Sequence, residues 1–266
     1  MRLTATISSD FFATLVGIAN ACGNEIILHF SESTISLCVP PSPNQVSLWI
    51  GCKTLACFNK YTISSKTDNS IVFKCNAQQL YHSLSFEGSP NINFRLSGNK
   101  EFKCFEFEHN SADRLKKLSQ KVEVTILSNS SIEQLHEPEW TQSSIAIKIP
   151  SFKSVLSWIN EMKDINSLVV MNGTPEGVLG FHIENESVSI STQYSRLEVI
   201  GENNREGEVL IEVKKLKKIL KVGNIPACVG VVYIYDKQMA RFHFVTQSSG
   251  TPVQLTYILN ATTKAN

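Results

Sequence analysis

One short segment carries the residues whose type and spacing point most directly to chemistry. Residues 213–221 read Val-Lys-Lys-Leu-Lys-Lys-Ile-Leu-Lys. On a helix with ~100° per residue, four of the lysines share an arc of about 100°, and the apolar residues occupy a separate arc. The four lysines are Lys214, Lys217, Lys218 and Lys221. Because ammonium groups suit phosphate oxygens, this pattern predicts a helix that presents cations to an anionic partner. A solvated helix face would show the same pattern.

Residues that could catalyse a reaction or hold a metal show no comparable pattern. The sequence contains no P-loop, G-x-G-x-x-G, G-x-S-x-G or H-E-x-x-H motif. Its six histidines are dispersed, and its seven cysteines include no C-x-x-C pair. We therefore expect no catalytic residues, no metal site and no cofactor.

The composition describes a folded chain with balanced charge. The chain has 266 residues, of which 42% are hydrophobic, and 25 Lys and Arg oppose 24 Asp and Glu. These values exclude a disordered chain and a protein that is basic over its whole surface, but not a local basic face. No apolar run reaches the ~18 residues of a membrane span.

The first residues and four sequons leave a secreted protein as an alternative. The apolar run from Phe11 to Ala19 imitates a signal peptide, and N-x-S/T sequons begin at Asn129, Asn172, Asn185 and Asn260. Against this, Asp10 directly precedes the run, and the cysteines are scattered and odd in number. We therefore favour an intracellular, reduced protein.

The elements that must position the lysines follow an order that occurs twice. Each half reads as a strand, a helix, several strands, a second helix and three strands, and corresponding elements lie about 135–140 residues apart. This order predicts an α+β fold of two similar domains, 1–128 and 144–266, joined by a loop over 129–143. Each domain would have two short helices and about eight to nine antiparallel strands. Among the expected strands are Lys121–Leu127, Val188–Gln193 and Arg196–Ile200.

The order and several local stretches resemble a known family along almost the whole chain. The chain resembles the Hus-one subunits of the heterotrimeric nine-one-one DNA-damage checkpoint clamp, within the sliding-clamp superfamily. The stretches that carry the resemblance include Met1–Ile7, Val46–Trp49, Phe58–Tyr61, Leu135–Pro138, Ile147–Pro150, Met239–Phe244 and Gln254–Leu259.

The resemblance implies a non-catalytic ring subunit that encircles double-stranded DNA in the nucleus. Its partners would be two clamp-related subunits, a clamp loader, and checkpoint and repair proteins, with no membrane involved. Because clamp helices line the central hole, five lysines would face the DNA phosphates without reading sequence. These are Lys153, Lys214, Lys217, Lys218 and Lys221.

The resemblance also implies where the ring closes and where client proteins dock. Rings of this kind close by pairing of edge strands, which here would carry Lys121, Val122, Val124 and Ile126 on one side, and Val188, Ile190 and Thr192 on the other. Clients would contact Leu135 and Trp140 in the connecting loop, although these two side chains could instead anchor the loop.

The missing positive charge on the helices of the first half bears on the choice between a checkpoint clamp and a replicative clamp. The two helices predicted in the first half carry no lysine or arginine on their exposed positions. Three copies in a homotrimeric replicative clamp, a polymerase processivity factor, would each present this weakly basic sector to DNA. In a heterotrimer the partners could supply the charge, so the checkpoint clamp is favoured and the replicative clamp remains the alternative.

Overall fold

A computed structural model describes residues 1–7, 10–42, 45–66, 68–85, 92–99, 101–110, 117–128, 130, 132, 135–201 and 205–262. The chain divides into two compact units. Unit 1 comprises Met1–Glu137 and Gln247–Gln254, and unit 2 comprises Pro138–Thr246 and Leu255–Asn266. The residue limits that we predicted for the domains and their connecting loop remain predictions, and positions 129, 131, 133 and 134 of that loop lie outside the described residues.

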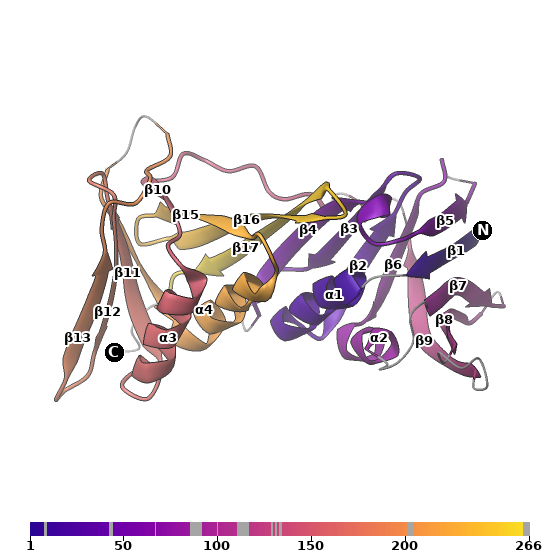
Figure 1. The fold of residues 1–266 in the computed structure, drawn as a ribbon, viewed down its shortest axis with the longest axis horizontal. Coiled ribbons are helices and arrows are strands. Elements are labelled where there is room, and N and C mark those ends of the chain that lie inside the picture. The colour runs from indigo at the N-terminus through magenta and orange to yellow at the C-terminus, as the bar shows by residue number, and fades with distance from the viewer. Residues whose placement is uncertain are drawn as a thin grey trace. The chain divides into compact units, whose positions relative to one another are not determined.

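Unit 1 is built from antiparallel strands and two helices (Figure 1). Its elements are β1 (Arg2–Ile7), α1 (Asp10–Cys22), β2 (Glu25–Phe30), β3 (Thr34–Val39), β4 (Ser47–Lys53), the 3₁₀ turn η1 (Thr54–Ala56), β5 (Lys60–Ser64), β6 (Ile71–Asn76), α2 (Ala77–Leu84), β7 (Ile92–Gly98), β8 (Lys103–Asn110) and β9 (Lys117–Leu127). The strands lie in the order β4-β3-β2-β6-β9-β8-β7-β1-β5.

Alternating apolar residues and a cluster of phenylalanines form the core of unit 1. In β1 the side chains of Leu3, Ala5 and Ile7 are buried, while the residues between them are partly exposed. The phenylalanine rings pack at centroid distances of 4.8 to 6.0 Å, which suits edge-to-face and offset contacts. These rings belong to Phe30, Phe73, Phe94 and Phe105. The helices α1 and α2 pack against each other and against β2, β3, β4, β6 and β9.

Unit 2 repeats this order with eight strands among its described residues. Its elements are β10 (Ile145–Lys148), α3 (Phe152–Met162), β11 (Leu168–Thr174), β12 (Val178–Glu184), β13 (Ser189–Tyr194), β14 (Gly207–Glu212), α4 (Val213–Leu220), the 3₁₀ turn η3 (Lys221–Asn224), β15 (Val229–Tyr235), β16 (Met239–Ser248) and β17 (Thr251–Asn260). The strand orders are β10-β15-β16-β17 and β13-β12-β11-β14. The tip of the β16–β17 hairpin is the part that belongs to unit 1.

In each unit one strand differs from the prediction, and in each case the segment lies beside the first strand of its unit. The strand β5 was not predicted, and it pairs with β1 in unit 1. The predicted strand Arg196–Ile200 is wrong, because its only ladder contact is an isolated bridge between Val199 and Ile147 of β10. Arg196 has a φ of 61°, outside the range of an extended strand, so the segment joins β10 only from Glu198 onward.

Candidate nucleic-acid interface and assembly edges

The helix α4 separates its apolar side chains from its lysines as the sequence predicts. Its apolar residues are all buried, namely Val213, Leu216, Ile219 and Leu220. Lys214 and Lys221 are exposed, and Lys217 and Lys218 are half-buried. Half-burial is usual for lysines, whose apolar stems lie along the surface while the charged group stays in water. The helix therefore places four cations on one side.

We define the lysine face as the five lysines that we predicted to contact DNA, namely Lys153, Lys214, Lys217, Lys218 and Lys221. The fifth lysine of the segment, Lys215, is excluded because its Nζ lies 2.7 Å from Oε1 of Glu212. Lys153 is exposed on α3, and α3 packs against α4 within unit 2, as Figure 1 shows. The structure thus carries four of the five predicted lysines on two adjacent helices, and Lys221 in the 3₁₀ turn η3 that directly follows α4.

The helices of unit 1 present a different surface. The exposed positions of α1 and α2 are Asp10, Thr14, Gln78, Gln79 and His82. Asn76 caps α2 by accepting a hydrogen bond from the backbone N–H of Gln79 at 2.9 Å. Neither helix contains a lysine or arginine. The lysine face is therefore a property of unit 2.

The first predicted edge strand is free along only part of its length. Residues 117–124 of β9 pair with β8, and residues 124–127 also pair with β6 on the opposite side. The backbone beside Lys121 and Val122 is therefore unpaired on the side away from β8 among the described residues. Val124 and Ile126 lie opposite Cys75 and Phe73 of β6. The open edge is thus shifted toward the start of β9, which begins four residues earlier than we predicted.

The second predicted edge strand, β13, is the terminal strand of the four-stranded sheet. It pairs with β12 alone in the part of the chain that the structure describes. Ile190 and Thr192 lie in β13 and are half-buried. Val188 lies in the preceding turn, where its N–H donates to Oδ1 of Asn185 at 2.8 Å. An open edge with free backbone donors and acceptors is a template for another strand.

The two predicted docking side chains are already in contact with the protein. Leu135 is only 8% exposed. The ring of Trp140 lies 6.3 Å from that of Tyr235 and 5.3 Å from the guanidinium carbon of Arg241. Arg241 also stacks on Tyr233 at 4.0 Å. No local sequence pattern singles out Arg241, because Trp140 is distant from it along the chain.

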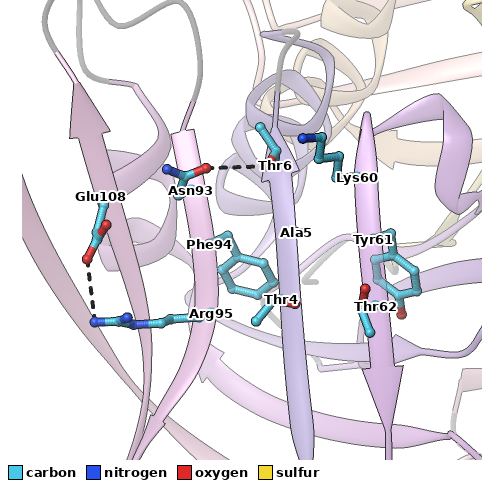
Figure 2. Close-up of a pocket in the computed structure, with 10 residues that line it drawn as sticks. All are labelled: Thr4, Ala5, Thr6, Lys60, Tyr61, Thr62, Asn93, Phe94, Arg95 and Glu108. Carbon is cyan, nitrogen blue, oxygen red and sulfur yellow. Dashed lines mark hydrogen bonds and ion pairs between the residues drawn. The ribbon is translucent and has the colours of Figure 1, made fainter. Parts of the chain in front are cut away.

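A shallow pocket of about 400 Å³ opens on unit 1 over β1, β5, β7 and β8. Figure 2 shows Thr4 and Thr6 at its floor and Arg95 turned toward Glu108. Arg95 lies 3.0 Å from Glu106 and 3.4 Å from Glu108, and its hydrogen bond holds the pKa of Glu106 below its ordinary value. The charged side chains at this pocket thus form ion pairs between β7 and β8.

Two further observations concern the described residues alone. No group of three or more His, Cys, Asp or Glu side chains in them is arranged to hold a metal ion. No helix among them is both long enough and apolar enough to cross a membrane.

Comparison with solved structures identifies the fold. The chain superposes on the sliding clamp PCNA of A. fulgidus, solved with the C-terminal region of FEN-1, with a TM-score of 0.75, 15% identity, and coverage of 99% of this chain and 100% of that one. PCNA from Thermococcus kodakaraensis gives a TM-score of 0.72 at 12% identity, with 98% and 100% coverage. These likenesses confirm the predicted duplicated α+β sliding-clamp fold.

Comparison of sequences identifies the family. The checkpoint protein Hus1 homolog of Dictyostelium discoideum is 23% identical over 246 residues, which cover 89% of each chain. The checkpoint protein HUS1 of Homo sapiens is 22% identical over 243 residues, covering 85% of this chain and 84% of that protein. The profile of the family described as Hus1-like protein matches residues 1–263. The chain belongs to the Hus1-like family, as the resemblance predicted.

Proposed function

We propose that this chain is a non-catalytic subunit of a heterotrimeric ring that encircles double-stranded DNA at sites of damage. In the nucleus, the ring acts as a scaffold for checkpoint signalling and repair enzymes. The observation that carries the DNA contact is the lysine face of α3 and α4, in a chain whose family consists of checkpoint proteins. Ring partners, a clamp loader and client proteins belong to the same proposal.

The lysine face supports DNA binding through its geometry: at the start of α4 the acid Glu212 is paired with Lys215, and on α3 Glu161 offsets only part of the positive charge. Like charges at i, i+4 on a helix cost a few tenths of a kcal/mol per pair, so Lys214 with Lys218 and Lys217 with Lys221 are unfavourable without an anion. A row of phosphates offsets this cost and releases counterions. Flexible ammonium groups hold phosphates without a fixed register, which permits movement along the duplex.

The uneven charge of the two units supports a ring of different subunits. Lysines lie on both helices of unit 2 and on neither helix of unit 1. In a ring of three identical chains, the same uncharged sector would face the duplex three times. In a ring of three different chains, the partners supply cations beside unit 1. The alternative, a homotrimeric replicative clamp, is disfavoured by this asymmetry and by the checkpoint relatives.

The open edges of β9 and β13 support assembly through strand pairing. Each strand has unpaired backbone groups along one side in the described residues. Pairing with a neighbouring subunit would satisfy these groups. Clients would dock at the connecting segment through Leu135 and Trp140, and the burial of Leu135 and the contact of Trp140 with Tyr235 limit how much of each side chain a client reaches.

Charge reversal on α4 tests the DNA contact. We expect the double variant Lys217→Glu/Lys218→Glu, assembled with the clamp partners, to be lost from circular DNA at salt concentrations that the wild-type ring tolerates. Each lost phosphate contact should also lower the slope of log affinity against log salt by about 0.9. The measurement is retention of loaded ring on a closed plasmid across a salt series.

The matched control is Lys53→Glu/Lys60→Glu, which changes net charge equally on exposed strand residues of unit 1. This control should retain wild-type behaviour. Equal retention of the α4 variant and the wild type, with assembly intact, would remove the assigned role from Lys217 and Lys218.

A further inference from the structure

We propose that Cys52 and Cys57 of unit 1 are a redox-sensitive thiol pair that hydrogen peroxide converts into an intramolecular disulfide. The proposal is independent of DNA binding and ring assembly. Their sulfur atoms lie 3.8 Å apart in the reduced protein. This distance places one sulfur within hydrogen-bonding reach of the other, and the S–S bond length of about 2.05 Å requires the two sulfurs to approach by about 1.8 Å.

The backbone around the two cysteines holds their side chains together. Cys52 lies near the end of β4, and Cys57 directly follows the single turn of η1. The N–H of Cys57 donates to the carbonyl of Thr54 at 3.1 Å, and that of Phe58 donates to the same oxygen at 2.9 Å. The N–H of Thr54 itself donates to the carbonyl of Ser33 at 2.9 Å. The turn is therefore fixed at both ends before any bond forms.

The chemistry needs one peroxide molecule for each disulfide. The Cys52 thiolate attacks the peroxide O–O bond, which gives a sulfenic acid at Cys52 and, after protonation, one water. The Cys57 sulfur then attacks the sulfenic sulfur, forms the S–S bond and releases the hydroxyl as a second water. Two thiols thus lose two electrons and two protons, and the peroxide is reduced to two waters.

The environment assigns the order of these steps. Both cysteines are buried, Cys52 at 8% and Cys57 at 2% exposed, so Cys52 is the more accessible of the two to peroxide. The hydrogen bond to Cys52 and burial raise the pKa of the Cys57 thiol, which keeps its proton on Cys57 in the reduced pair. The more exposed Cys52 is therefore assigned as the first nucleophile, and the protonated Cys57 as the thiol that forms the disulfide.

The disulfide would fix a turn that presents an apolar side chain to solvent. Leu55 sits between the two cysteines and is 71% exposed, far more than the other large apolar side chains of η1 and its neighbours. The carbonyl of Ala56 in the same turn accepts a hydrogen bond from Oγ of Ser248 at 2.8 Å, also within unit 1. Oxidation would therefore tie the turn that carries Leu55 covalently to β4.

Trypsin mapping tests the proposal directly on the full chain. Lys53 lies between the two cysteines, so trypsin separates Cys52, in residues 3–53, from Cys57, in residues 54–60. We expect peroxide treatment, followed by alkylation of free thiols and digestion without reductant, to join these two peptides in most molecules. Dithiothreitol should separate them again, and the oxidised protein should unfold at a higher urea concentration.

Variants identify the sulfur atoms involved. Cys52→Ser and Cys57→Ser should each abolish the joined peptide, whereas Cys228→Ser should leave it unchanged. A joined peptide that persists in Cys52→Ser would overturn the pairing, since Cys22 and Cys38 lie in the same tryptic peptide. Failure of the wild-type chain to form the joined peptide, with its other thiols oxidised, would overturn the proposal without reliance on any variant.

Discussion

Trp140 illustrates how one residue can serve two roles. Its ring lies beside Arg241, whose guanidinium in turn stacks on Tyr233. Cation–π contacts contribute about 0.5–1 kcal/mol at exposed sites and about 2 kcal/mol or more when water is excluded. Trp140 therefore anchors the start of unit 2, and a client protein that uses the ring must compete with these contacts.

Removing the ring should weaken unit 2 measurably. We expect Trp140→Ala to lower the free energy of unfolding by about 1–2 kcal/mol, because an aromatic contact and a cation–π contact are lost. A double-mutant cycle with Arg241→Ala, measured by urea denaturation, should give a coupling energy of about 0.5–1 kcal/mol. Strictly additive effects would show that the two side chains do not interact in solution.

The sequence anticipated the lysine face more fully than it anticipated this stack. Helical spacing over nine residues was enough to place Lys214, Lys217, Lys218 and Lys221 opposite the buried residues of α4. The stack joins Trp140 to Arg241 across about a hundred residues, and no local pattern encodes such a contact. Helical faces follow from short-range periodicity, whereas tertiary contacts depend on the register of distant strands.

At the scale of elements, the turn between β11 and β12 depends on Gly177. This glycine has a φ of 76°, and an added Cβ would lie 2.3 Å from the carbonyl oxygen of Leu197. Its own carbonyl accepts a hydrogen bond from the N–H of Leu197 at 2.9 Å. The turn thus fixes the segment that follows β13, and no side chain fits between the two backbones.

Alanine at this turn should cost more than alanine at a glycine with open space. Gly201 has a φ of 92°, and no atom of the described residues lies within 4 Å of an added Cβ. We expect Gly201→Ala to cost about 1–2 kcal/mol from the left-handed backbone alone, and Gly177→Ala about 2–4 kcal/mol because a backbone clash is added. Thermal unfolding of the two variants provides the comparison. Equal losses would mean that the turn relaxes around the new methyl group.

Proline can separate the role of β13 in the fold from its role in assembly. Successive residues of a strand direct their N–H groups to opposite edges, so one of Ser191 and Thr192 donates toward β12 and the other toward the open edge. We expect one of the variants Ser191→Pro and Thr192→Pro to unfold more easily. The other should keep its unfolding temperature and lose assembly, because proline removes the outward donor.

Light scattering of each proline variant, mixed with its clamp partners, provides the readout. Thr62→Pro in β5, an end strand of the unit 1 order, serves as a control for proline in an edge strand outside the predicted interfaces. A β13 variant that folds normally and assembles as well as the wild type, while its neighbour is merely unstable, would contradict pairing through this edge.

The strands that sequence reasoning missed or misplaced share a physical cause. In β5 only Ile63 is buried, so the apolar alternation that marks a half-buried strand is almost absent. In 196–200 the alternation is present, but the left-handed backbone at Arg196 delays the pairing with β10. Edge positions are specified by their neighbours in the sheet more than by their own sequence.

For the whole molecule, the decisive quantity is the mass of the assembled particle. We expect the purified chain alone to scatter as a monomer of 29.6 kDa and to form a one-to-one-to-one trimer with two clamp-related proteins. The reason is that only unit 2 carries the lysine face, so a closed ring around DNA needs partner subunits that supply positive charge beside unit 1. A stable homotrimer of the pure chain would instead support a replicative clamp.

The division of the chain has a consequence for its synthesis on the ribosome. Unit 1 includes Gln247–Gln254, which are made only after nearly all of unit 2. The amino-terminal unit therefore cannot be completed as soon as its first 137 residues emerge, even though domains generally fold in the order of translation. Until residues 247–254 have been synthesised, unit 1 lacks part of its chain, and its strand edges stay open. A chaperone that shields the early segment would have its longest task during that interval.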